Sequence, residues 1–288
     1  MGLVHIPVLL EEVINNLISE KTNIFIDATV GGGGHAYNIL ERYKNVRLIG
    51  LDVDEDILRV TGERLCGFEG RARLIRGAFR DLRNILDAEG VSSFDGILFD
   101  LGLSTFQITG ERGFSFNDNS FLDMRMDNRE SLTAYDVVNG YDYKELLRII
   151  RDYGEDYRAP AIAKIIVETR KKEPISTAKE LGNIVLKVKR RTGRIHPATK
   201  TFQAIRIEVN DELRSLQTGI AAAIDMLSPE GRIGVISFHS LEDRIAKFAF
   251  RTSPVLEVIT KKPIRPERIE TKENPSSRSA KLRIAEKK

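Results

Sequence analysis

Residues 24–35 read IFIDATVGGGGH, and this stretch decides the fold. A short apolar run leads into Asp27 and four consecutive glycines, and residues 36–43 then have helical character. A strand, a glycine turn and a helix in this order open the nucleotide-binding α/β sheets. Glycine suits the turn because it lets the backbone bend sharply and approach a ligand with no Cβ in the way. The stretch therefore predicts the ligand-binding start of an α/β domain.

The glycine pattern alone is weak evidence for a particular ligand. Gly31, Gly33 and Ala36 fit the dinucleotide pattern G-x-G-x-x-A, and no Gly-Lys-Ser/Thr follows, which argues against a phosphate-binding Walker loop. The next apolar run, residues 46–51, ends in Asp52. An acid at the tip of the second strand, roughly 20 residues after the glycines, is where such sheets bind a ribose diol. Together the two features predict an adenosine-type ligand.

Short apolar runs continue along the chain, and helical stretches separate the first four of them. This alternation predicts parallel strands with right-handed crossovers. Ligands of such sheets bind at the carboxyl ends of the strands, where Asp27, Asp52, Phe79 and Asp100 all fall. The expected strands are residues 24–26, 46–51, 71–75, 94–99, 232–236, 255–260 and 282–284.

The alternation breaks after Leu101. Up to about Arg206 no apolar strand appears, whereas helical periodicity recurs over residues 143–151, 159–170 and 178–190, with Thr177 suited to cap the last of these helices. We therefore expect a helical insertion between the fourth and fifth strands. The expected parts are residues 1–106 and 207–288, which form the sheet domain, and residues 107–206, which form a mainly helical substrate-recognition domain.

Composition excludes several classes of protein. A single cysteine, Cys66, rules out a disulfide framework and suits the reducing cytoplasm. No apolar run approaches the roughly 18 residues of a membrane span, so we expect no membrane partner. The four histidines lack the paired spacing of metal ligands, and we predict no metal site.

The net charge of +3 conceals an uneven distribution. Residues 1–157 carry 17 Lys/Arg against 27 Asp/Glu, whereas residues 158–206 carry 13 against 3 and residues 261–288 carry 10 against 4. A basic segment and a basic tail beside an acidic half indicate a polyanionic partner.

Two cofactors fit a glycine turn followed by an acid: a nicotinamide dinucleotide and S-adenosylmethionine. Hydride transfer needs an acid/base pair at the strand ends, and no obvious Lys/Tyr or His/Asp pair occurs there. Asp100, followed by Leu-Gly-Leu-Ser, stands where amino-group methyltransferases have their acceptor loop. A carboxylate that accepts hydrogen bonds from an exocyclic amine helps the nitrogen rehybridise for attack, with positioning supplying most of the acceleration. The residues by themselves favour methyl transfer to an amine and leave the nicotinamide alternative open.

At these residues the sequence closely resembles a known family, the bacterial ribosomal small-subunit RNA (16S rRNA) cytosine-N4 methyltransferases. The resemblance covers nearly the whole chain, and its motifs are long and specific. They are HIPVLLEEV (5–13), DATVGGGGH (27–35), LDVD (51–54), FDLGLSTFQ (99–107), RGFSF (112–116), LDMRMD (122–127), HPATKTFQAIRIEVNDEL (196–213), ISFHSLEDRIAK (236–247) and RSAKLRIAEK (278–287).

The resemblance implies a class I, Rossmann-like methyltransferase fold with a helical insertion, and S-adenosylmethionine as the methyl donor. It implies a cytosine in the decoding region of small-subunit ribosomal RNA as the target, within the small ribosomal subunit, and a cytoplasmic location. Asp100 as the catalytic acceptor of the amine protons is an inference from its position. The cofactor-binding residues implied by the motifs are Gly33, Gly34, His35, Asp52, Phe79, Asp100 and Gln107.

We expect basic residues between the pocket and the helical insertion to contact RNA phosphates. Phe114 and Phe116 are available to stack on a base that is turned out of the RNA. Two further readings stay open: a nicotinamide-dependent oxidoreductase, and an RNA-binding ribosome-assembly factor that uses its cofactor only structurally. The residues expected to bind RNA are Arg112, Arg125, Arg190, Arg191, Arg194, His196, Lys200 and Arg206.

Overall fold

The computed structural model describes residues 6–103, 110–189 and 196–288. The chain divides into two compact units, Met1–Gly102 with Leu213–Lys288, and Leu103–Glu212. These division points lie near the boundaries expected from the sequence, 106/107 and 206/207. Within the described ranges, no helix is both long and apolar enough to span a membrane.

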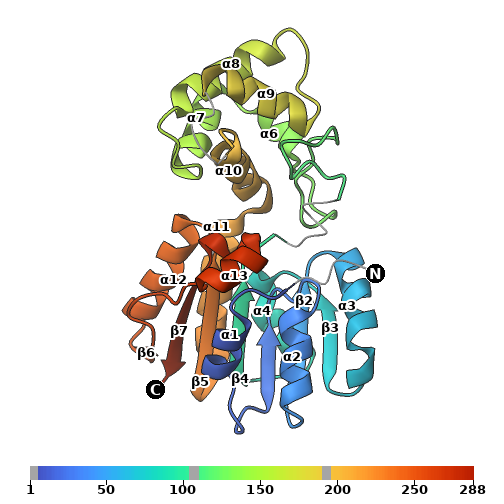
Figure 1. The fold of residues 1–288 in the computed structure, drawn as a ribbon, viewed down its shortest axis with the longest axis vertical. Coiled ribbons are helices and arrows are strands. Elements are labelled where there is room, and N and C mark those ends of the chain that lie inside the picture. The colour runs from blue at the N-terminus through green and yellow to red at the C-terminus, as the bar shows by residue number, and fades with distance from the viewer. Residues whose placement is uncertain (1–5, 104–109, 190–195) are drawn as a thin grey trace. The chain divides into compact units, whose positions relative to one another are not determined.

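The first unit is built on a seven-stranded sheet of order β3-β2-β1-β4-β5-β7-β6 (Figure 1). Strands β1 to β5 are parallel, and β7 runs antiparallel between β5 and β6. This is the class I methyltransferase order, and the expected fold class is confirmed. It differs from the dinucleotide order 3-2-1-4-5-6 by the insertion of β7. The strands are β1 (Ile24–Asp27), β2 (Arg47–Asp52), β3 (Ala72–Arg76), β4 (Phe94–Asp100), β5 (Leu227–Ser237), β6 (Leu256–Val258) and β7 (Lys281–Lys287).

Helices cover both faces of this sheet. Side chains of successive strand residues point to opposite faces, so each face has its own apolar cluster. The helices α1 (Leu10–Leu17), α2 (Gly34–Arg42) and α3 (Glu55–Leu65) supply one cluster, and α4 (Leu82–Ala88), α11 (Glu212–Met226) and α12 (Ser240–Thr252) supply the other. A short helix, α13 (Arg268–Glu273), precedes the last strand.

The final strand is longer than the expected residues 282–284, because β7 gains partners on both sides. It pairs with β5 and β6 and is buried at its centre, including Arg283. The guanidinium of Arg283 lies 2.6 Å from Asp243 on α12. Burial works against the charged carboxylate, but the hydrogen bond and charge of Arg283 outweigh it and lower the pKa of Asp243. A cation inside the sheet is therefore accommodated by pairing.

The second unit is helical and has its own apolar core. Three of its helices begin with a capping box, at Thr133, Asp142 and Thr177, which confirms the predicted cap at Thr177. The helices α6 and α10 are not among those predicted from the sequence. The helices are α6 (Ala134–Gly140), α7 (Tyr143–Asp152), α8 (Ala159–Arg170), α9 (Ala178–Val188) and α10 (Thr199–Asn210).

Candidate functional site

The glycine turn has the conformation that only glycine adopts without strain. Gly31 and Gly33 have φ values of +49° and +72°, in the left-handed region. A Cβ on Gly33 would lie 2.9 Å from Thr61 Cγ2 of α3. The turn therefore packs tightly against α3, whereas a Cβ on Gly32 would meet no atom within 4 Å. The space over Gly32 is open for a ligand.

Asp52 ties the end of β2 to this turn. Its Oδ2 accepts a hydrogen bond from Gly31 N at 3.1 Å, and its Oδ1 accepts one from Asp54 N at 3.0 Å. Two backbone donors thus fix the carboxylate beside the glycines. Each oxygen keeps a second lone pair, which suits the carboxylate to accept hydrogen bonds from a diol.

The segment before α1 covers the start of α2. Pro7 packs on Gly34, where a Cβ would lie 3.1 Å from Pro7 Cγ. The buried His35 places Nε2 3.0 Å from Val8 O. A carbonyl only accepts, so Nε2 carries the proton. The residues just before α1, which begins at Leu10, therefore lie against the start of α2.

Asp100 ends β4 at the same edge. Its backbone N donates to Thr29 Oγ1 at 2.7 Å, and its Oδ2 lies 3.8 Å from His35 Nδ1. Its Oδ1 is buried and, among the described residues, makes no hydrogen bond. A buried acceptor left without a donor costs free energy, so a ligand with an N–H or O–H group would find a ready partner here.

Three carboxyl groups at this edge have raised pKa values. Burial raises the pKa of Asp27 to about 7, and the charges of Asp100 and Asp52 add to the effect. Burial raises the pKa of Asp100 to about 7, opposed by the Gly102 backbone N–H and helped by the charge of Glu242. Burial likewise raises the pKa of Asp52 to about 6, against its backbone hydrogen bonds. Asp27 is 1% exposed, whereas the Asp100 side chain keeps 16%.

These pKa values make stability depend on pH. The ordinary value is 3.8, so between about pH 4 and 7 the folded chain holds protons that the unfolded chain has lost. The contribution of Asp27 and Asp100 to the free energy of unfolding therefore falls as pH rises through this window. We expect a smaller fall in Asp100→Asn, measured as urea midpoints between pH 4.5 and 8. Equal pH dependence in the two proteins would contradict the raised pKa of Asp100.

Phe79 lies in a short 3-10 helix after β3. Its ring meets Phe99 edge to face at 5.6 Å between centroids. Gly219 of α11 packs so closely that a Cβ there would lie 2.8 Å from the Phe79 ring. The ring is thus held in place and partly exposed, as a residue bordering a flat ligand requires.

Six of the residues expected to bind the cofactor lie in the first unit, at or shortly after the carboxyl ends of β1 to β4. Gln107 falls outside the described residues. The contacts of all seven expected residues with a cofactor stay predictions. The six are Gly33, Gly34, His35, Asp52, Phe79 and Asp100.

Several residues expected to bind RNA are engaged within the second unit. Arg125 makes a two-bond ion pair with Asp123, at 2.7 and 2.9 Å. Arg206 makes a similar pair with Glu212, at 2.7 and 2.9 Å. The charges of Arg125 and Arg206 are therefore partly neutralised by carboxylates of the same unit.

The remaining predicted RNA contacts differ in their surroundings. Lys200 Nζ donates to Glu155 O at 2.7 Å. His196 stacks on Phe116, with 4.0 Å between ring centroids, so Phe116 already has a stacking partner. Arg112 donates to Met126 O at 3.4 Å, and Phe114 is buried in the core of the unit. Arg190, Arg191 and Arg194 lie outside the described residues.

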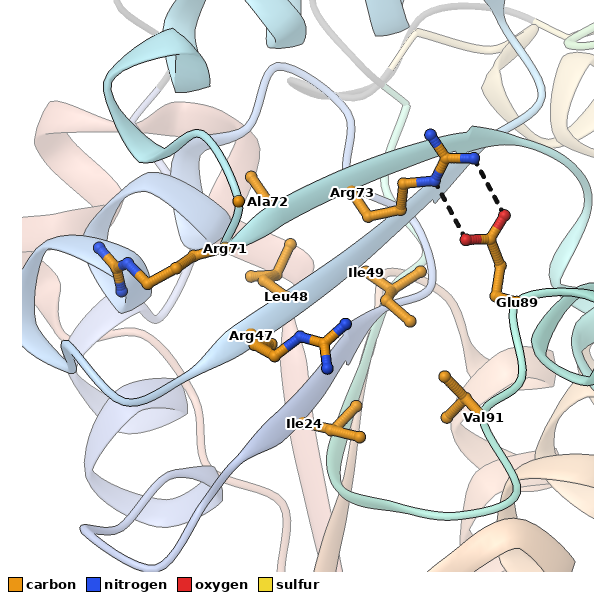
Figure 2. Close-up of a pocket in the computed structure, with 10 residues that line it drawn as sticks. Ile24, Arg47, Leu48, Ile49, Arg71, Ala72, Arg73, Glu89 and Val91 are labelled. Carbon is orange, nitrogen blue, oxygen red and sulfur yellow. Dashed lines mark hydrogen bonds and ion pairs between the residues drawn. The ribbon is translucent and has the colours of Figure 1, made fainter.

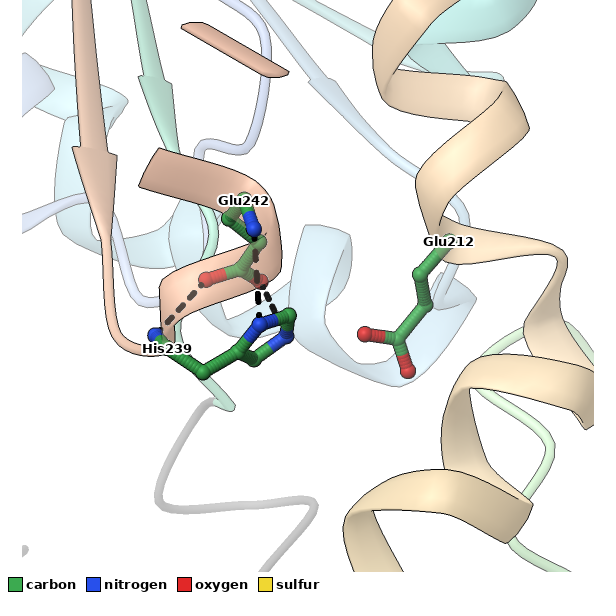
Figure 3. Close-up of side chains that lie close together, drawn as sticks. All are labelled: Glu212, His239 and Glu242. Atoms are coloured by element: carbon green, nitrogen blue, oxygen red, sulfur yellow. Dashed lines mark hydrogen bonds and ion pairs between the residues drawn. The ribbon is translucent and has the colours of Figure 1, made fainter. Parts of the chain in front are cut away.

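Sequence reasoning gave no role to His239 and Glu242, which begin α12 directly after β5 (Figure 3). His239 is the N-cap, and the Glu242 carboxylate accepts hydrogen bonds from Phe238 N and His239 N, at 2.8 and 3.2 Å. Both side chains are buried. The available signal was the spacing H-x-x-E after an apolar strand, which has the form of a capping box with histidine as the cap.

A separate pocket lies at the opposite edge of the sheet (Figure 2). It has a volume of about 210 Å³ and includes the first residues of β1 and β2, Ile24 and Arg47. Arg73 and Glu89 at its rim pair through two bonds of 3.1 Å. Because these are the amino ends of parallel strands, the pocket is not where such sheets bind their cofactors.

Comparison with known proteins relates the whole chain to one family. Residues 2–288 match the model of the MraW methylase family. The ribosomal RNA small subunit methyltransferase H of Sulfurihydrogenibium sp. is 52% identical over 286 residues, covering 97% of this chain and 98% of the relative. The protein of that name from Pseudothermotoga lettingae is 47% identical over 296 residues and covers both chains fully.

One solved structure shows a distant likeness to the chain. An rRNA methylase from Streptococcus thermophilus has a TM-score of 0.46 and 12% identity, covering 99% of each chain. That likeness adds nothing to the assignment, which rests on the family match and on relatives of about half identity along the full length. The chain belongs to the MraW methylase family.

Proposed function

We propose that this protein transfers a methyl group from S-adenosylmethionine to the N4 amine of a cytosine in the decoding region of small-subunit ribosomal RNA, in the cytoplasm. The observation that carries the proposal is the buried Asp100 Oδ1, an acceptor without a donor at the carboxyl end of β4. Membership of a methylase family and relatives named for small-subunit ribosomal RNA support it.

The residues present fit this cofactor. Open space over Gly32 and the tight turn at Gly33 allow a ligand to approach the backbone closely. Asp52 would accept hydrogen bonds from the ribose hydroxyls, and Phe79 would border the adenine. Gly34 and His35 would line the methionine end, with Asp100 and Gln107 closing the pocket. When bound, the cofactor supplies an activated methyl group on a sulfonium.

In this proposal Asp100 binds the amine that accepts the methyl group. Its Oδ1 accepts a hydrogen bond from the exocyclic amine, whose lone pair is otherwise delocalised into the base. This bond turns the lone pair toward the methyl carbon. Transfer would break the methyl–sulfur bond of the cofactor, which would leave as a neutral thioether. The newly methylated nitrogen would then be positively charged and would lose one proton, which the Asp100 carboxylate would accept. A pKa near 7 suits a group that takes and releases protons at neutral pH.

The second unit supplies the RNA contacts in this proposal. Its basic segment, residues 158–206, carries 13 Lys/Arg against 3 Asp/Glu. Phosphate contacts release counterions, so affinity for naked RNA falls as salt rises. Arg112, His196 and Lys200, with the arginines at 190, 191 and 194, are the proposed contacts. Because Arg125 and Arg206 are both held in ion pairs, they would contribute to the shape of the RNA-binding surface as much as to its charge.

The test is transfer of labelled methyl to small ribosomal subunits that lack the modification, with naked RNA at two salt concentrations alongside. Nucleosides are identified by mass. We expect label in N4-methylcytidine. Label in another nucleoside would overturn the target base, and cofactor binding without any transfer would favour an assembly factor. Competition between S-adenosylmethionine and a nicotinamide dinucleotide tests the oxidoreductase alternative.

A further inference from the structure

His239 has one ring nitrogen in use and one unused. Nδ1 accepts a hydrogen bond from Glu242 N at 3.4 Å, which caps α12. Nε2 lies 3.1 Å from Glu242 Oε1, yet it has no hydrogen-bond partner among the described residues. Nε2 and Glu242 Oε1 are therefore close enough to interact electrostatically, but they do not have the geometry of a hydrogen bond. The side chain is 9% exposed, so water does not readily replace the missing partner.

The cap fixes which nitrogen carries the proton. A backbone N–H only donates, so Nδ1 presents a lone pair, and the neutral ring carries its hydrogen on Nε2. Serine, threonine, aspartate and asparagine are the usual N-caps, and each would cap α12 without a buried second nitrogen. Histidine thus adds a directed donor that the helix start itself does not need.

This donor and the unpartnered acceptor of Asp100 stand at the ends of two neighbouring strands, β5 and β4. Asp100 is opposite Ile236 in the sheet register, and Leu101 N donates to Ile236 O at 3.0 Å. Phe238, the neighbour of His239, packs on Gly102, where a Cβ would lie 2.9 Å from its ring. The carboxyl ends of β4 and β5 therefore bring one buried acceptor and one buried donor to the same edge.

We propose that His239 Nε2–H donates to the ring nitrogen beside the target amine while Asp100 Oδ1 accepts from the amine itself. The inference rests on the proposed function and identifies the two residues that would select the target base. Cytosine presents this order of groups, with an amine next to a bare ring nitrogen. Uracil presents the reverse order, a carbonyl next to a ring N–H, and would leave both protein groups unpaired. The pair selects amine-bearing bases.

Two substitutions separate this role from capping. In His239→Asn, the side chain still caps the helix, because asparagine is among the preferred N-caps, but it lacks the Nε2 donor. In His239→Gln, the amide nitrogen reaches toward the position of Nε2, but glutamine is a poor cap. The measurements are the urea midpoint, cofactor affinity by calorimetry, and kcat and KM for methyl transfer to small subunits lacking the modification.

We expect His239→Asn to keep its urea midpoint and cofactor affinity while transfer falls about tenfold to hundredfold, the usual loss for a buried group left unpaired. His239→Gln should be less stable yet retain more of the transfer rate than His239→Asn. If transfer instead follows stability, with His239→Asn active and His239→Gln impaired, His239 is only a cap and the inference is overturned. If the unsubstituted protein transfers no methyl to any RNA, the proposed function fails and the inference falls with it.

Discussion

Replacing Asp100 by asparagine should lower kcat for methyl transfer about 100-fold to 10,000-fold, the usual range for losing a positioned proton acceptor. The amide keeps the shape of the side chain but takes up no proton from the amine. Because the native carboxyl has a raised pKa, removing its charge relieves a burial cost above pH 7. The variant should therefore unfold at an equal or higher urea concentration at pH 8.

The matched control for this substitution is Asp95→Asn on the same strand. Asp95 stands near the amino end of β4, where its carboxylate accepts hydrogen bonds from Asn23 N and Ile24 N at 2.8 and 3.0 Å. It lies at the edge away from the proposed chemistry, so transfer should stay within about twofold of the unsubstituted rate. Unchanged kcat in Asp100→Asn, measured with labelled cofactor at saturation, would remove Asp100 from the mechanism.

Replacing Gly33 by alanine should weaken cofactor binding by more than tenfold and destabilise the fold by about 1–3 kcal/mol. The left-handed conformation alone costs a residue with a Cβ roughly 1–2 kcal/mol. The approach to Thr61 Cγ2 at 2.9 Å adds a steric cost that the packed α3 helix must absorb by shifting. Urea unfolding and calorimetric titration with the cofactor measure the two effects.

Gly32→Ala is the comparison that separates strain from ligand approach. Gly32 is outside the left-handed region, and its added Cβ would meet no protein atom within 4 Å. Its stability should change by less than about 0.5 kcal/mol, as for a substitution without a steric or backbone conflict. A loss of cofactor affinity in this stable variant would indicate that the ligand passes close to residue 32. Equal stability loss in the two variants would contradict the packing at Gly33.

The sheet and the edge that holds the candidate site follow from local sequence patterns. Apolar runs with helical stretches between them specify parallel strands, and carboxyl ends of parallel strands share one edge. Asp27, Asp52 and Asp100 could therefore be assigned to that edge from their positions after the runs. The glycine turn could also be predicted from local sequence, because φ values of +49° and +72° favour residues without a Cβ.

Only the tertiary structure decided which side chains have partners. Residues 100 and 239 are far apart in the chain, and strand register brings their segments together. The pairing of Arg206 with Glu212 and the contact of His35 with Val8 O likewise depend on how the elements pack. Local pattern fixes where a strand ends, but the free energy of a buried polar atom depends on neighbours that folding brings from elsewhere in the chain.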